Sequence, residues 1–289
     1  MKATVESQGS KRLKAIGLWL ATFLLMLVMC VPGLWVMLSG FRPNREILAK
    51  PPIWVPETVT LDNFGKIFGW GAEQIAIPVP AYFTNSLIIA LTSTLIALGV
   101  GMAGGYAFAR FRFRGKGALF LGLMLFRTVP GIALSLPIFM IWSRLGLIDT
   151  KLGLIIVYVS LNVPFTIWLI DGFFRQIPLS LSEAAQVDGC TRWQAFWKIE
   201  FPLARSGIAS AGVFAFLTSW NEFALASQLT RSTDSKTLPV GLLDFTAQFT
   251  IDWAGMCAMA VIIIIPALIL TFIVQKHLIA GLTFGGVKG

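Results

Sequence analysis

Two groups of residues in this chain have types and spacing that could do chemistry. The first lies in a polar loop between two long apolar segments and contains Glu183, Ala184, Ala185, Asp188 and Gly189. A carboxylate in such a loop makes a charge-assisted hydrogen bond to a partner or holds the cap of its own helix. A glycine supplies the left-handed turn that ends a helix. We interpret this group as a docking element, against the simpler hypothesis of an ordinary polar loop.

The second group consists of polar and aromatic residues inside apolar segments, namely Arg127, Asn162, Trp220, Asn221 and Glu222. A charge at the bilayer centre costs at least about 2.5 kcal/mol on insertion scales, so Arg127 should face a cavity or a partner. An aromatic face beside amide groups suits a sugar ring, whose CH face is apolar and whose rim forms hydrogen bonds. Two interpretations stay open for this group: contact with a solute, or structural roles such as an Arg127–Glu222 ion pair and packing or gating by the tryptophan.

The sequence does not indicate catalysis or metal binding. No segment brings His, Cys, Ser and carboxylates together at the spacing of metal ligands or of a nucleophile and its base, so we expect no catalytic residue. Cys30, Cys190 and Cys257 have no paired spacing, which argues against a disulfide framework and a metal site. The chain also lacks the G-x-x-x-x-G-K-[ST] phosphate loop, and we expect no cofactor in it.

The polar loop carries start and stop signals for two short helices. Ser180-x-x-Glu183 has the spacing of a capping box, and Gly189 is placed to end the helix that this box begins. Thr191-x-x-Gln194 has the same spacing and predicts a second helix, which Pro202 should stop. The loop is therefore predicted to be a helical hairpin.

The composition places the rest of the chain in a bilayer. Of 289 residues, 56% are hydrophobic and 13% charged, and the mean hydropathy is +0.78. Soluble domains carry about a quarter charged residues. The net charge is +9, and the basic residues fall between apolar segments. Membrane topology explains that pattern better than nucleic-acid binding does, so we expect a lipid bilayer and no nucleic acid among the partners.

Six apolar runs have the length of about 20 residues that a membrane-crossing helix needs. We place these spans near residues 15–38, 82–109, 118–142, 152–172, 206–228 and 254–275. They form one transmembrane domain over residues 15–275, between an N-terminal tail at 1–14 and a C-terminal tail at 276–289. The first run continues without a charge and without a convincing cleavage site, so we interpret it as a retained anchor.

The basic residues also predict the orientation of the spans. Most Lys and Arg residues lie in the two tails and in the 110–117 and 173–205 loops, and the run Arg110, Arg112, Arg114 and Lys116 is the densest. Basic residues accumulate on the cytoplasmic side of membrane proteins. Both termini and the Glu183 loop are therefore expected in the cytoplasm.

The order Glu183-Ala184-Ala185, Gly189, Ile199 and Pro202 resembles the EAA loop of the membrane subunits of bacterial ATP-binding-cassette importers, with Phe201 where that family usually has Leu. Tyr82-Phe83-Thr84-Asn85-Ser86 and Ser219-Trp220-Asn221-Glu222-Phe223 resemble motifs of the carbohydrate and polyol permeases of the maltose-importer type. The resemblance implies an all-α polytopic protein with six transmembrane helices and a cytoplasmic coupling hairpin at 178–202, the type I importer permease fold.

The resemblance also implies a function and partners. The chain would form half of the translocation pathway for a sugar or polyol in the bacterial cytoplasmic membrane, beside a second homologous permease subunit. Two ATPase subunits would bind ATP and Mg, and one of them would receive the helix Leu181–Gly189. An extracytoplasmic solute-binding protein would deliver the solute. The chain itself would be a non-catalytic permease subunit.

Two other classes of protein are weighed against this one. An ion-coupled secondary carrier of a small polar solute needs intramembrane carboxylates and a repeated half, and Glu222 alone fits. A membrane enzyme needs a polar cluster at the membrane interface, which the sequence does not contain.

Overall fold

The computed structural model describes residues 8–71, 77–246 and 251–283, and these residues are mainly helical. The chain divides into two compact units, one formed by Met1–Ile75 with Phe245–Ile262 and the other by Ala76–Asp244 with Ile263–Gly289. Within the described residues, five helices are long and apolar enough to cross a membrane, or six if one bent pair is a single span.

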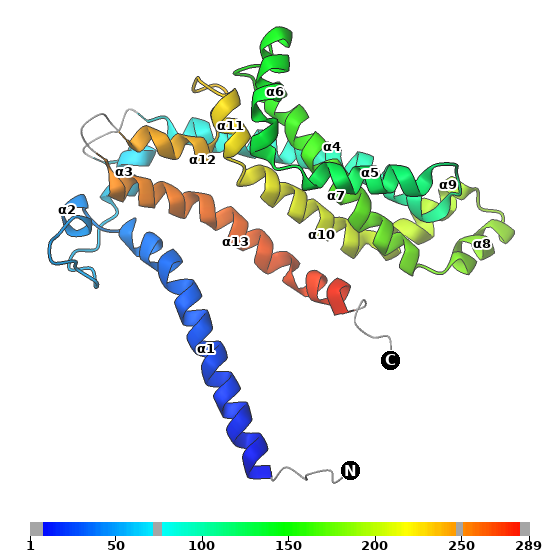
Figure 1. The fold of residues 1–289 in the computed structure, drawn as a ribbon, viewed down its shortest axis with the longest axis horizontal. Coiled ribbons are helices and arrows are strands. Elements are labelled where there is room, and N and C mark those ends of the chain that lie inside the picture. The colour runs from blue at the N-terminus through cyan, green and yellow to red at the C-terminus, as the bar shows by residue number, and fades with distance from the viewer. Residues whose placement is uncertain (1–7, 72–76, 247–250, 284–289) are drawn as a thin grey trace. The chain divides into compact units, whose positions relative to one another are not determined.

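The second unit is a helical bundle (Figure 1). Helices α4, α7 and α10 pack against one another and α5 packs against α7, with α8 and α9 at one end of the bundle and α11 and α12 at the other. The helices of this unit are α4 (Val79–Arg110), α5 (Lys116–Thr128), α6 (Gly131–Leu145), α7 (Lys151–Gln176), α8 (Leu179–Val187), α9 (Arg192–Ala195), the π-helix η1 (Phe196–Glu200), α10 (Phe201–Trp220), α11 (Ala224–Leu229) and α12 (Leu238–Gly241). Helix α13 (Trp253–Thr283) begins in the first unit and continues into the second from Ile263.

Close approach of α4 and α7 depends on glycines. A Cβ atom on Gly101 would lie 2.6 Å from Oγ1 of Thr166, and one on Gly105 would lie 2.9 Å from the backbone N of Asp171. The hydroxyl of Thr166 donates a hydrogen bond to the carbonyl of Ala97 at 3.1 Å. Small residues let helix backbones pack tightly in lipid, where van der Waals contact and interhelical hydrogen bonds drive association.

The first unit contains α1 (Gln8–Ser39), α2 (Asn44–Ile47) and α3 (Asp62–Phe68). Arg42 is buried between α1 and α2 and donates hydrogen bonds to the carbonyls of Ile53 and Trp54, both at 2.9 Å. Its guanidinium carbon lies 4.9 Å from the centroid of the Trp35 ring. These contacts fold the connection that follows α1 onto the end of that helix.

Four predicted spans lie inside long helices, and two differ from the structure. Those at 15–38, 82–109, 152–172 and 254–275 fall within α1, α4, α7 and α13. The predicted span at 118–142 is broken into α5 and α6, which are bent by 95°. Proline has no N–H and disfavours helical backbone in the residue before it, and Val129, before Pro130, is extended.

The predicted span at 206–228 ends early, because α10 stops at Trp220 and α11 begins at Ala224. The intervening Glu222 accepts hydrogen bonds from the N–H groups of Leu225 and Ala226, at 2.8 and 2.9 Å. A side chain that caps new N–H groups marks the start of a separate helix.

The two predicted tails are only partly described. Residues 1–7 of the N-terminal tail and 284–289 of the C-terminal tail lie outside the described residues. Helix α13 continues to Thr283, beyond the predicted end of the last span at residue 275.

Candidate functional site

The loop that contains Glu183 forms a helical hairpin. Helix α8 ends in a Schellman motif, in which Cys190 N–H donates to the carbonyl of Ala185 at 2.9 Å and Gly189 N–H donates to that of Gln186 at 3.1 Å. Gly189 has a φ of 88°, in the left-handed region that favours glycine. The glycine therefore ends α8 as the sequence predicts.

One predicted capping box is present and the other is wrong. Thr191 Oγ1 accepts from Gln194 N–H, and Gln194 Oε1 accepts from Thr191 N–H at 2.9 Å, so α9 begins with the predicted box. Helix α8 instead begins at Leu179, directly after Pro178, without a side-chain cap. This earlier start moves Ser180 to the second helical position, where its hydroxyl cannot take the N-cap role that the box requires.

The prediction that Pro202 stops the second helix is also wrong. The chain passes from α9 through η1 into α10 as one helical run, Arg192–Trp220. Pro202 lies in the first turn of α10, after the π-helix. Proline is tolerated in a first turn, and a π-helical segment changes the hydrogen-bond pattern there, so the missing N–H does not break the run.

The hairpin presents one face of α8 outwards. Glu183, Ala184, Asp188 and Gly189 are exposed, whereas Ala185 is buried. Val187 follows Glu183 by one helical turn and is 88% exposed. This face therefore combines an accessible carboxylate with an accessible apolar side chain.

A buried carboxylate outside the predicted site residues holds the hairpin in place. Glu200 is 1% exposed. Its Oε2 accepts from Arg110 Nε at 2.7 Å, and its Oε1 accepts from Ser182 Oγ at 2.6 Å and from Tyr106 OH at 3.4 Å. From the sequence, Arg110 indicates only membrane topology. No local spacing reveals this site, because its members come from α4, α8 and η1.

The hypothesis of an Arg127–Glu222 ion pair is wrong for the described residues. Arg127, on α5, is exposed, and its guanidinium carbon lies 4.0 Å from the centroid of the Phe165 ring on α7. Glu222 accepts from Tyr158 OH at 3.0 Å and from the two N–H groups that open α11. The carboxylate is therefore already engaged, and the guanidinium interacts with an aromatic face instead.

The structure separates the other predicted pathway residues into two environments. Asn162 is buried and donates to the carbonyl of Tyr158 and to Oγ of Ser219, both at 2.9 Å. Trp220 is 1% exposed, and its Nε1 donates to the carbonyl of Ile263 at 3.0 Å. Asn221 is exposed. The buried pair thus joins helices of the bundle, whereas Asn221 and Arg127 are accessible.

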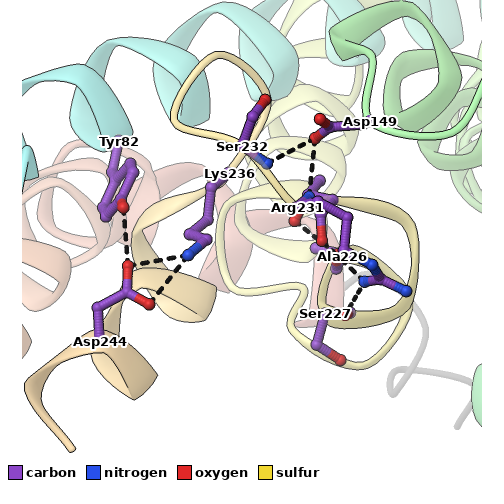
Figure 2. A network of polar contacts seen from close by, with 9 residues as sticks. Tyr82, Asp149, Ala226, Ser227, Arg231, Ser232, Lys236 and Asp244 are labelled. Atoms are coloured by element: carbon purple, nitrogen blue, oxygen red, sulfur yellow. Dashed lines mark hydrogen bonds and ion pairs between the residues drawn. The ribbon is translucent and has the colours of Figure 1, made fainter. Parts of the chain in front are cut away.

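A polar network lies at the end of the bundle opposite the hairpin (Figure 2). Asp149, between α6 and α7, accepts from the N–H groups of Arg231 and Ser232, at 2.7 and 2.9 Å, and from the hydroxyl of Ser235. Burial raises the pKa of Asp149, but these hydrogen bonds outweigh it and lower the pKa to about 2. The ionised Asp149 side chain therefore holds the loop after α11 in place through these hydrogen bonds.

Acid should weaken this end of the molecule. A carboxyl whose pKa is lowered by folding contributes stability above its unfolded pKa, and the contribution is lost as the pH falls through the folded value. For Asp149 the window runs from the ordinary value of 3.8 down to about 2. We expect Asp149→Asn to lower the apparent Tm at pH 6 and to reduce the decrease in Tm between pH 4 and pH 2, measured by thermal unfolding in detergent.

Asp234 provides the control for that experiment because it is exposed on the same loop. Asp234→Asn should keep the pH dependence of the unmodified protein. An unchanged pH dependence in Asp149→Asn would contradict the role of the Asp149 carboxylate.

Comparison with known proteins identifies the class of this fold. Residues 95–283 match the family described as binding-protein-dependent transport system inner membrane component. The chain therefore belongs to this family of inner-membrane permease components, and it is a multi-pass membrane protein. The predicted resemblance to ATP-binding-cassette importer permeases is confirmed, and so is the all-α fold.

Individual relatives agree with this assignment. The trehalose transport system permease protein SugB of Mycobacterium tuberculosis is 37% identical over 90% of this chain and 92% of its own length. The diacetylchitobiose uptake system permease protein DasC of Streptomyces coelicolor is 33% identical over 89% and 91%. A chain from the crystal structure of a bacterial transporter involved in the import of alginate has a TM-score of 0.77 at 21% identity, covering 95% of this chain and 99% of that one.

Proposed function

We propose that this chain forms half of the translocation pathway for a sugar or polyol in an ATP-driven, binding-protein-dependent importer of the bacterial cytoplasmic membrane. The names of the trehalose and diacetylchitobiose permeases support a carbohydrate solute. The other half is a second homologous permease subunit, and a solute-binding protein delivers the solute from outside. The basic tails and loops support a cytoplasmic location of both termini.

The exposed face of α8 is the observation that carries the coupling part of this proposal. Glu183 and Val187 are accessible on a helix that a Schellman motif ends and that packs on α9 and η1. An apolar side chain beside a carboxylate suits insertion into a cleft of another protein. We place an ATPase subunit on this face. Two such subunits hold ATP and Mg, and the permease chain is non-catalytic and carries no cofactor.

Cross-linking tests the docking face. In a background without the three natural cysteines, Val187→Cys should form a short-range cross-link to the co-purified ATPase subunit in native membranes. Asp234→Cys is the matched control, because that residue is exposed in the loop between α11 and α12, and these two helices lie at the opposite end of the bundle (Figure 1). No cross-link from position 187, or equal cross-linking from both positions, would contradict the docking assignment.

Arg127 and Asn221 are the candidates for the solute pathway, since both are polar and exposed on otherwise apolar segments. An intramembrane charge is costly and in most membrane proteins faces a water-filled cavity or a partner group. We expect Arg127→Ala to reduce uptake of labelled disaccharides about tenfold without loss of co-purification, as for loss of a hydrogen bond from a charged group. Arg127→Lys should recover part of the uptake.

Arg144→Ala is the control for removal of an exposed arginine, because Arg144 lies near the end of α6. Uptake should stay near that of the unmodified complex. Normal uptake by Arg127→Ala would remove Arg127 from the pathway.

A further inference from the structure

One guanidinium clamps both ends of the docking hairpin to α4. Arg110 is the last residue of α4. Its Nε donates to Glu200 at 2.7 Å, and its Nη2 donates to the carbonyl of Ile177 at 3.1 Å. Ile177 directly precedes the hairpin, and Glu200 ends the π-helix that leads out of it. The chain segments that enter and leave the hairpin are therefore both hydrogen-bonded to the Arg110 side chain.

The Glu200 carboxylate extends the clamp to the docking helix itself. Its second oxygen accepts from Ser182, on the inner face of α8, at 2.6 Å. A cavity of about 300 Å³ beside this contact is lined by residues of both helices, including Arg110 of α4 and Glu183 and Gln186 of α8. The Glu200 side chain thus links Ser182 of α8 to Arg110 of α4 beside that cavity.

Helix α4 is also held at its opposite end. Asn85 donates to the carbonyls of Thr233 and Lys236, at 2.7 and 2.9 Å, and the hydroxyl of Tyr82 donates to Asp244 at 2.7 Å. Thr233 and Lys236 belong to the loop between α11 and α12, and Asp244 belongs to the 3-10 helix η2 (Leu242–Phe245) that follows α12. This loop lies at the end of the bundle away from the hairpin (Figure 1). Helix α4 therefore makes side-chain hydrogen bonds at both ends of the unit.

We infer that Glu200 is a positioning residue that joins the docking helix to α4 through Arg110, so that displacement of α8 moves α4 and the loop at its far end. The inference rests on the proposed docking of α8. The mechanical part of the inference follows from the burial of the ion pair, because the Arg110 and Glu200 side chains are 8% and 2% exposed. Separating a buried ion pair leaves an uncompensated charge, which is costly. A joint of this kind resists separation, and force on α8 passes through it.

The test uses the complete importer complex with the Val187→Cys cross-link as an internal report of docking. We expect Glu200→Gln to keep that cross-link but to reduce the stimulation of ATPase activity by disaccharide-loaded binding protein about tenfold, as for loss of a hydrogen bond to a charged group. The exchanged pair Arg110→Glu with Glu200→Arg should recover much of the stimulation, which a purely steric role would not. Arg114→Gln, which alters an exposed arginine nearby, is the control and should keep normal stimulation.

The outcomes separate this inference from the proposed function. Normal stimulation in Glu200→Gln, or an exchanged pair no better than the single variants, would overturn the clamp while leaving the docking assignment intact. Absence of the cross-link in the otherwise unmodified complex would contradict the docking assignment instead.

Ser182→Ala removes one hydrogen bond and leaves the ion pair. If Glu200→Gln does not fold, a several-fold loss of stimulation in Ser182→Ala supports the joint, and normal stimulation overturns it.

Discussion

Gly189→Val should abolish ATP-driven uptake while the complex still inserts and assembles. Gly189 has a φ of 88°, and a β-branched residue in that conformation is a steric outlier. The left-handed conformation costs L-residues about 1–2 kcal/mol, so the chain is expected to leave it and to lose the Schellman hydrogen bonds that end α8. Uptake of labelled disaccharide by proteoliposomes, measured beside complex recovery, checks this result.

Gly189→Asn is the matched control, because asparagine visits the left-handed region more readily than most other residues with a side chain. A Cβ atom at position 189 meets no atom within 4 Å, so the added side chain causes no clash. The asparagine variant should therefore keep most of the uptake. Equal uptake in the valine and asparagine variants would show that the backbone conformation at this position does not matter for coupling.

Trp220→Ala should produce the largest loss of stability among the predicted pathway residues. The ring lies 5.5 Å from that of Phe216 and 5.8 Å from that of Phe83, between centroids, and its N–H bonds the carbonyl of Ile263. Truncation of a buried aromatic residue leaves a cavity, and we expect the free energy of unfolding to fall by about 3 kcal/mol. Thermal unfolding of the purified subunit in detergent measures this effect.

Two variants separate packing from solute contact at this position. Trp220→Phe loses the hydrogen bond but keeps most of the volume, so it should recover most of the stability. Trp19 is 76% exposed, and Trp19→Ala should leave the Tm nearly unchanged. A Trp220→Ala variant with normal stability and altered solute preference would contradict the packing role and favour the pathway role.

The features predicted correctly from the sequence are those that depend on a few neighbouring residues. The left-handed turn at Gly189 and the box formed by Thr191 and Gln194 are local, and the structure contains both. The Ser180 box failed because α8 begins at Leu179, after Pro178, two residues earlier than the box requires. The helix stop at Pro202 failed because a π-helix places that proline in a first turn.

The contacts that tertiary structure decides were not predictable in this way. Residue types inside the spans identified Arg127 and Glu222 as unusual, but their actual partners are Phe165 and Tyr158, on a different helix. Glu200 lies far in sequence from Arg110, and its burial depends on how η1 packs beside α4. A single sequence contains the charges of such a pair but not the packing that brings them together.

Transport by the reconstituted complex tests the central claim most directly. Proteoliposomes that contain this chain, its companion permease and the ATPase subunits should take up a labelled disaccharide only with ATP inside the cytoplasmic compartment and loaded binding protein on the other side. The same vesicles with Gly189→Val should take up almost none. Uptake by this chain alone, without nucleotide and without the other subunits, would contradict the account.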